Sequence, residues 1–231
     1  MGTYMKHIFW AGDSTVKHNR VNTYPQTGIG QVFNLYLKSD IEVHNHAENG
    51  RSTKSFISEG RLETIDKEIK EKNFLFIQFG HNDQKEDIER RTEAFGSYQD
   101  NLRQFINIAR KHGACPVLIT PLSRRIFDKE GVIKNHSHME YPDAMKEVAK
   151  ELDVPCIDLS EKSRELISKT GDLDSKKWFM HLKPNEYDNY SEGKEDNTHL
   201  KYEGAVVMAG LIAEGLKELG SVYAELLLDE V

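Results

Sequence analysis

The chain has 231 residues, of which 38% are hydrophobic and 30% charged, and its formal net charge is −7. This composition is typical of a water-soluble globular protein, and no apolar run approaches the roughly 20 residues that span a bilayer. The acidic balance argues against a nucleic-acid or anionic-membrane surface, which would need a basic face, so we expect neither partner.

Apolar runs and helical spacings alternate along the first half of the chain. Dense runs such as "NFLFIQFG" are typical of strands buried on both faces of a parallel sheet. Apolar residues three and four positions apart indicate helices between them. The sequence predicts strands over 6–12, 40–47 and 73–80, and helices over 28–39 and 58–72.

The same alternation continues to the carboxyl terminus. Ser97 is the expected N-cap of the next helix, which Gly113 ends. Further strands are predicted over 114–121 and 154–159, further helices over 142–153 and 203–219, and long irregular segments over 126–141 and 172–198. This order predicts an α/β fold with a five-stranded parallel sheet and helices on both faces, built as one domain over residues 1–231.

Side chains that can take part in catalysis or ligand binding follow several of the predicted strands. Ligands of open α/β sheets bind beyond the carboxyl ends of the strands, so these residues are expected at one edge. The residues that follow the predicted strands are Ser14, Asn49, Gly50, Arg51, Ser52, His81, Asn82, Asp83, Arg124 and Arg125, whereas Asp196 and His199 come just before the last predicted helix.

Three of these residues have the chemistry of a nucleophilic triad. The hydroxyl of Ser14 is a weak nucleophile that needs a base, and His199 is the candidate base. Asp196 stands three residues before His199 and reaches its other ring nitrogen if the segment turns. Asp13, beside Ser14, is expected to hydrogen-bond nearby backbone and to have a structural role.

An oxyanion that develops on a substrate needs preorganised hydrogen-bond donors. The backbone N–H groups of Ser14 and Gly50 and the side-chain amide of Asn82 are the candidates. Glycine suits this position because no side chain keeps a ligand away from the backbone.

Four blocks of sequence in this order resemble the SGNH (GDSL-type) hydrolases. They are "GDST", "NGRSTKSF", "FIQFGHND" and "DNTHL", and the resemblance spans Ile8 to about Ala205. More narrowly, the blocks are similar to the rhamnogalacturonan acetylesterase group of carbohydrate esterases. The chain lacks the G-x-S-x-G elbow of the other large α/β esterase class.

The resemblance implies a three-layer sandwich with a sheet of flavodoxin-like strand order. It implies Ser14 as nucleophile, His199 as base and Asp196 as the residue that orients it. It also implies an oxyanion hole formed by Ser14, Gly50 and Asn82, with neither metal nor cofactor. The substrate it implies is an acetylated oligosaccharide of pectin, rhamnogalacturonan or xylan type. Another short-chain esterase, lipase or thioesterase of the same fold is the alternative.

Candidate substrate-binding residues come from the long irregular segments and the end of the fourth strand. Arg124 and Arg125 are either solvated or meet a sugar carboxylate. Trp178, His181 and Tyr190 are candidates for sugar contacts, with ordinary loop packing as the alternative.

Two histidine pairs, "HNH" at 44–46 and "HSH" at 136–138, indicate metal at first sight. No third ligand stands at a familiar spacing, so a surface or core role is the expectation and no metal site is predicted.

A two-metal phosphoesterase is a further alternative because "GHND" resembles one of its motifs, but the Asp-x-His expected on the first strand is absent. A carbohydrate-binding module with a dead site is disfavoured by the complete set of triad and oxyanion residues.

No signal peptide is visible, because the first apolar run is too short for an h-region. Many characterised members of the resembled family are secreted. We therefore expect a cytoplasmic protein that acts on imported oligosaccharides, and the sequence does not indicate an oligomeric state.

Overall fold

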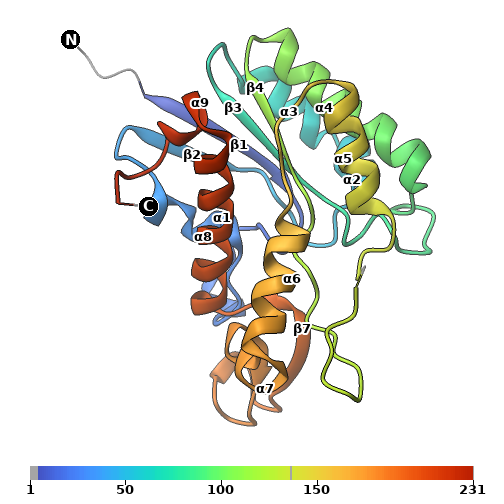
Figure 1. Cartoon of the computed structure of the whole chain (residues 1–231), viewed down its shortest axis with the longest axis vertical. Helices are drawn as coiled ribbons and strands as arrows, with labels where there is room; N and C mark the ends of the chain where they lie inside the picture. The colour runs from blue at the N-terminus through green and yellow to red at the C-terminus, as the bar shows by residue number, and fades with distance from the viewer. Residues whose placement is uncertain (1–4, 136, 231) are drawn as a thin grey trace.

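The computed structural model describes residues 5–135 and 137–230, and its centre is a five-stranded parallel sheet (Figure 1). The strand order is β2-β1-β3-β4-β5, as the resemblance implies. The strands are β1 (Lys6–Gly12), β2 (Ile41–Asn45), β3 (Phe74–Gln78), β4 (Cys115–Ile119) and β5 (Cys156–Ile157). The predicted α/β sheet with five parallel strands is therefore confirmed.

Helices cover both faces of this sheet and make the three layers (Figure 1). On one side lie α1 (Ile29–Val32), α6 (Leu159–Thr170), α8 (Tyr202–Leu219) and α9 (Ser221–Ala224). On the other side lie α2 (Thr53–Ser58), α3 (Arg61–Glu68), α4 (Gln99–Lys111) and α5 (Tyr141–Glu151).

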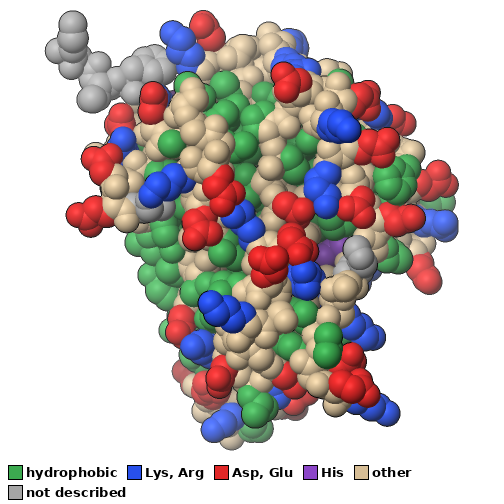
Figure 2. Space-filling model, in the orientation of Figure 1, with side chains coloured by type: hydrophobic (Ala, Val, Ile, Leu, Met, Phe, Trp, Pro, Cys, Tyr) green, Lys and Arg blue, Asp and Glu red, His purple; other side chains and the backbone are tan. Residues whose placement is uncertain are grey.

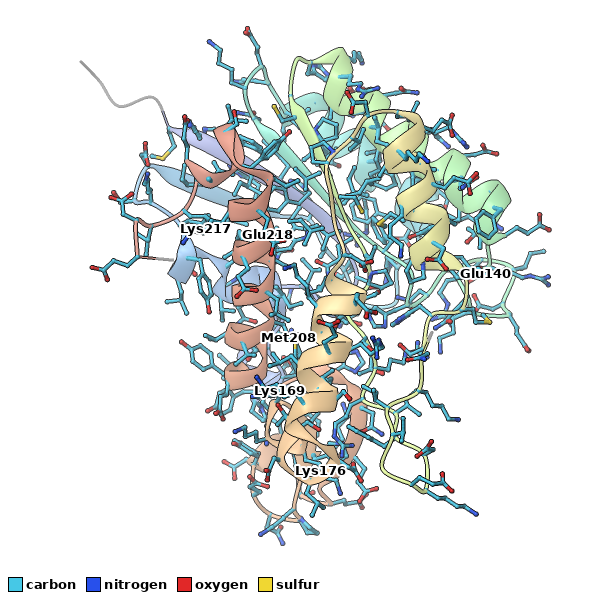
Figure 3. The ribbon with its side chains drawn as sticks, viewed as in Figure 1. Glu140, Lys169, Lys176, Met208, Lys217 and Glu218 are labelled. Atoms are coloured by element: carbon cyan, nitrogen blue, oxygen red, sulfur yellow. The ribbon has the colours of Figure 1, made fainter. Side chains whose placement is uncertain are left out.

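Alternation along the strands divides the core between the two faces. Trp10 and Phe76 pack under α1 and α8, whereas Phe9 and Ile77 pack under the helices of the opposite face. Successive side chains of a strand point to opposite faces, so a strand covered on both sides is apolar throughout. Met208 of α8 is fully buried on the first face and lies between α8 and α6 (Figure 3).

The predicted irregular segment 172–198 is largely ordered. After α7 (Asp172–Ser175) and a short 3₁₀ turn, β6 (Phe179–Leu182) and β7 (Lys194–Leu200) form an antiparallel hairpin outside the main sheet. A short 3₁₀ turn, Asp188–Tyr190, lies in its connection. The prediction of a loop here is wrong. Strand β7, Lys-Glu-Asp-Asn-Thr-His-Leu, was missed because it is polar and carries no apolar alternation. Residues 126–135 and 137–140 are irregular as predicted, apart from a bridge between Phe127 and Ile133, and α5 begins at Tyr141.

The helix predicted over 28–39 is only one α turn followed by a 3₁₀ turn, Phe33–Tyr36. Its first residues are hydrogen-bonded to the segment that follows β1, since the N–H of Ile29 donates to the carbonyl of Thr15. A Cβ on Gly28 would lie 2.1 Å from the carbonyl oxygen of Lys17, so this close approach requires glycine. The helix predicted over 58–72 is confined to α3.

Helices α2, α6, α7 and α9 were not predicted, and one predicted cap is wrong. Helix α2 begins with a capping box between Ser52 and Ser55, and α6 is capped by Asp158. The expected cap Ser97 lies within a distorted π turn, Ala94–Tyr98, where its hydroxyl accepts from the N–H of Glu93. A serine hydroxyl satisfies whichever backbone donor the chain brings near, so its position alone does not locate a helix start.

Acidic and basic side chains are interspersed over the face seen in Figure 2. Ion pairs such as Lys162–Glu218, which joins α6 to α8 at 2.6 Å, account for part of this mixture. Among the helices of residues 5–135 and 137–230, none has the length and apolar character needed to cross a membrane.

Candidate active site

Ser14 lies in a tight turn just beyond the carboxyl end of β1. The N–H groups of Val16 and Lys17 both donate to the carbonyl of Asp13, at 3.1 Å each. The Asp13 carboxylate closes the turn, since its Oδ1 accepts from the N–H and the hydroxyl of Thr15 at 2.9 and 2.8 Å. Asp13 and Thr15 are buried whereas Ser14 is partly exposed. The turn therefore presents the serine hydroxyl at the sheet edge, and Asp13 has the structural contacts expected of it.

The β6–β7 hairpin brings the other two triad candidates to Ser14. The Nε2 atom of His199 lies 2.9 Å from Ser14 Oγ, and its Nδ1 lies 2.7 Å from Asp196 Oδ2. Asp196 and His199 are three residues apart on β7, and the remaining carboxylate oxygen accepts from the N–H groups of Thr198 and His199. The three side chains thus form the continuous hydrogen-bonded array that the sequence predicts.

The Asp196 carboxylate is held in its charged form. Its burial would raise its pKa, but hydrogen bonds from the His199 ring and from two backbone N–H groups outweigh burial and lower the pKa well below the usual range. Lys194 adds an ion pair at 3.2 Å from Asp196 Oδ2. An ionised acceptor beside Nδ1 keeps the proton there, which leaves Nε2 free to accept from Ser14.

The three predicted oxyanion donors are available. Among the hydrogen bonds of residues 5–135 and 137–230, none uses the backbone N–H of Ser14 or Gly50. Gly50 has φ +74°, a conformation that favours glycine. The Asn82 amide donates one hydrogen to the carbonyl of Arg51 at 3.0 Å, which fixes it beside Gly50 and leaves its second N–H for a ligand. Arg90 Nη1 lies 3.4 Å from the amide oxygen.

Two buried carboxyl groups, those of Asp13 and Asp83, support these loops. The sequence does not indicate that their pKa values are raised. Burial raises the pKa of Asp83 to about 7 and that of Asp13 to about 6, against hydrogen bonds from Thr53 and Thr15 that lower them. One oxygen of each, Oδ2, is buried and has no hydrogen-bond partner in the described part of the chain. Because an unpaired buried oxygen disfavours charge, both groups retain protons to higher pH than an exposed aspartate.

Arg124 lies near the triad and Arg125 does not act there. Burial lowers the pKa of Arg124, and the nearby carboxylates of Asp13 and Asp196 oppose the decrease. Its Nη2 donates to the carbonyl of His81 at 3.3 Å, while its Nε is buried without a partner among the described residues. Arg125 is buried and hydrogen-bonded to Asn197, at 2.7 Å, and to Asp172, so it is a structural residue.

The remaining substrate-binding candidates, Trp178, His181 and Tyr190, all have structural contacts within the protein. Trp178 is 6% exposed and packs in the core, which leaves no ring face for a sugar. His181 Nε2 lies 2.7 Å from Asn197 Oδ1, the atom that also binds Arg125. Tyr190 is half-buried, and its hydroxyl donates to the carbonyl of Thr23 at 3.2 Å. His181 and Tyr190 are therefore placed to hold the hairpin that carries the triad acid and base.

The histidine pair "HSH" contributes one described residue, because His136 lies outside the described part of the chain. His138 is buried, and its Nε2 lies 2.9 Å from Nδ1 of the equally buried His81. Burial and the neighbouring Arg124 lower the pKa of His138 to about 3. The pair is thus neutral and belongs to the packing beneath the site, a contact that linear spacing does not reveal.

Comparisons with known proteins agree with this geometry. Residues 11–205 match the GDSL-like Lipase/Acylhydrolase family. The chain is 47% identical to rhamnogalacturonan acetylesterase RhgT of Bacillus subtilis over 92% of this chain and 90% of that protein. It is 41% identical to the probable rhamnogalacturonan acetylesterase YesY of the same organism, over 97% and 98% respectively.

The fold is also similar to a solved structure. The crystal structure of the YxiM protein of Bacillus subtilis superposes with a TM-score of 0.79 and 25% identity, covering 94% of this chain and 57% of that one. The family match extends from the end of β1 into α8 and so includes every candidate triad and oxyanion residue. On this evidence the chain belongs to the GDSL-like lipase/acylhydrolase family of carboxylic ester hydrolases.

Proposed function

We propose that the protein removes acetyl groups from rhamnogalacturonan-type oligosaccharides, with Ser14 as nucleophile. The observation that carries the proposal is the array Ser14–His199–Asp196 at 2.9 and 2.7 Å, together with N–H groups at Ser14 and Gly50 that donate to no other group of the described chain. The acetylated substrate class is supported by the names of RhgT and YesY, which this chain resembles over nearly its full length.

The geometry suits acyl transfer in two steps. Ser14 Oγ attacks the acetyl carbonyl carbon and its proton passes to His199 Nε2, while the carbonyl oxygen becomes an oxyanion bound by Ser14 N–H, Gly50 N–H and the Asn82 amide. The intermediate collapses, the ester C–O bond breaks, and the sugar oxygen leaves with the proton from His199. Water then attacks the acetyl-serine, again giving its proton to His199, and acetate is released as Ser14 recovers its hydrogen.

Arg124 is the candidate for recognising an acidic sugar. Its guanidinium lies near Asp196 and Asp13 at the sheet edge, and its planar group suits a carboxylate. Galacturonate carries such a carboxylate, whereas neutral xylo-oligosaccharides do not. Arg124→Lys should therefore raise KM for acetylated rhamnogalacturonan fragments and leave KM for acetylated xylo-oligosaccharides unchanged. An equal change for both substrates would assign Arg124 to the framework of the site.

The proposed activity is tested with acetylated rhamnogalacturonan oligosaccharides and p-nitrophenyl acetate. Ser14→Ala is expected to lower kcat at least about 10³-fold on both, because triad members act as a unit. Its Tm should match the wild type, since the change removes one partly exposed hydroxyl. Ser191→Ala, at an exposed position in the hairpin, is the control. Release of acetate by the Ser14→Ala variant at the wild-type rate would refute the assignment.

A further inference from the structure

Three metal-ligating side chains meet at the sheet edge far from Ser14. His7 of β1 and Glu42 and His44 of β2 place one ligand atom each within 4.8 Å of the others. His7 Nδ1 lies 2.9 Å from His44 Nε2, and Glu42 Oε2 lies 3.5 and 3.8 Å from those two nitrogens. The imidazoles are 31% exposed at the side chain and the carboxylate is 55% exposed, so the cluster is open to ions in solution.

The three separations match the edges of a metal tetrahedron. Zinc binds histidine nitrogen and carboxylate oxygen at about 2.0–2.2 Å, so ligand atoms in a tetrahedral site are about 3.3–3.6 Å apart. The observed distances of 2.9, 3.5 and 3.8 Å lie below, within and above this range. A cation at their centre would need only small side-chain rotations, and solvent would complete its coordination.

Rigid strands hold the three residues in place. Parallel pairing puts His7 directly opposite Glu42, and His44 follows two positions along the same strand, so all three point to one face. The Phe9 ring stacks on the His44 imidazole, with centroids 4.7 Å apart and planes inclined by 13°. Ligands on paired strands with a fixed ring plane lose little conformational freedom when a metal binds.

We propose that His7, Glu42 and His44 form a binding site for a zinc-class divalent cation. Two imidazoles and one carboxylate select Zn²⁺ and its neighbours over Mg²⁺ and Ca²⁺, which prefer oxygen ligands alone. The site joins β2, an edge strand, to β1 and so stabilises the edge of the sheet. The pair "HNH" contributes only His44, and the ligands that complete the site come from positions that linear spacing does not connect.

The proposed ion has no part in ester hydrolysis. His7 lies near the amino end of β1 and Ser14 beyond its carboxyl end. At a rise of about 3.3 Å per residue, the strand alone separates His7 from Gly12 by roughly 17 Å. Binding at one end should therefore change stability and leave the reaction at the other end unaltered.

Calorimetric titration with Zn²⁺ and thermal unfolding with Zn²⁺ or EDTA test the site. We expect one Zn²⁺ per chain and a higher Tm with Zn²⁺ than with EDTA. His44→Gln and Glu42→Gln should each weaken binding at least tenfold and remove the Zn²⁺-dependent rise in Tm. Turnover of p-nitrophenyl acetate should be the same in all these proteins, which confirms that they are folded.

His46→Gln is the matched control. His46 follows the last residue of β2 and stacks on the same Phe9 ring at 5.7 Å, but its Nε2 lies 3.6 Å from Glu68, outside the cluster. The His46→Gln variant should retain wild-type Zn²⁺ affinity. Absence of Zn²⁺ binding by the wild type, or equal binding by the His44→Gln variant, would overturn the proposal.

Discussion

Asp83 and Thr53 join the two loops that carry the oxyanion donors. The Oδ1 atom of Asp83 accepts from the backbone N–H of Thr53 at 3.0 Å and from its hydroxyl at 2.6 Å. Asp83 follows Asn82 directly, and Thr53 begins α2, three residues after Gly50. The buried carboxyl group therefore fixes the spacing between two groups that must bind the same oxygen atom.

The first prediction concerns stability and pH. The pKa of Asp83 is raised from 3.8 to about 7 in the folded chain, so between these values the folded state binds more protons than the unfolded state. The contribution of Asp83 to stability should therefore fall as pH rises through this window, by up to about 1.4 kcal/mol per pH unit, and level off above it. Asp83→Asn should have a flatter profile in urea unfolding between pH 4 and pH 7, whereas exposed Asp174→Asn should retain the wild-type slope. Identical profiles for wild type and Asp83→Asn would show that folding does not raise the pKa of Asp83.

The second prediction concerns Asn82. Its free N–H is proposed to bind the oxyanion, which exists only as charge develops. Asn82→Ala should lower kcat roughly 10²–10³-fold with little change in KM. Steady-state kinetics on p-nitrophenyl acetate measure this, with exposed Asn34→Ala as the control. A change in KM alone would place the Asn82 amide in ground-state substrate binding.

The third prediction concerns the base and its acid. His199→Ala should cost about as much kcat as Ser14→Ala, and the double variant little more, because the residues act as a unit. Asp196→Asn should cost on the order of 10⁴-fold, since the amide favours the wrong tautomer of His199. His112→Ala, at the end of α4 where the half-buried ring contacts Asp66, should leave kcat unchanged. Near-normal rates for His199→Ala would show that another residue is the general base.

The fourth prediction separates the reaction from the proposed cation site. Ester hydrolysis should survive exhaustive chelation, because Ser14 is activated by His199 and no step requires a metal. The rise in Tm with Zn²⁺ should vanish under the same treatment. Loss of turnover with EDTA, and its recovery on adding Mn²⁺ or Zn²⁺, would contradict the serine mechanism.

The fifth prediction concerns acyl length. Segments 122–141 and 183–197 are rich in charged and polar residues and contain few long aliphatic side chains. A long acyl chain gains about 0.8 kcal/mol for each CH₂ group that it buries, and these segments offer little apolar surface for this. Values of kcat/KM should therefore fall from acetyl to octanoyl p-nitrophenyl esters. A rise along the series would favour a lipase or thioesterase.

The central sheet was predictable because its strands are covered on both faces and are therefore apolar throughout, as in Phe74–Gln78. Ser14 could be placed because it follows a strand whose carboxyl end lies at the ligand-binding edge, whereas Asp196 and His199 were assigned from their spacing and from the resemblance to a known family. The β6–β7 hairpin could not be predicted, because it is held by long-range hydrogen bonds of Arg125 and His181 to Asn197. The His7 cluster likewise depends on the pairing of β1 with β2.

The local pairing of acid and base has a consequence for how activity is gained during folding. Asp196 and His199 are three residues apart on β7 and are joined by two hydrogen bonds, whereas Ser14 and His199 are 185 residues apart. The triad is thus assembled from two pieces of chain, and only one long loop must close to complete it. In a refolding experiment, the return of catalysis should follow the docking of one hairpin onto a sheet that has already formed.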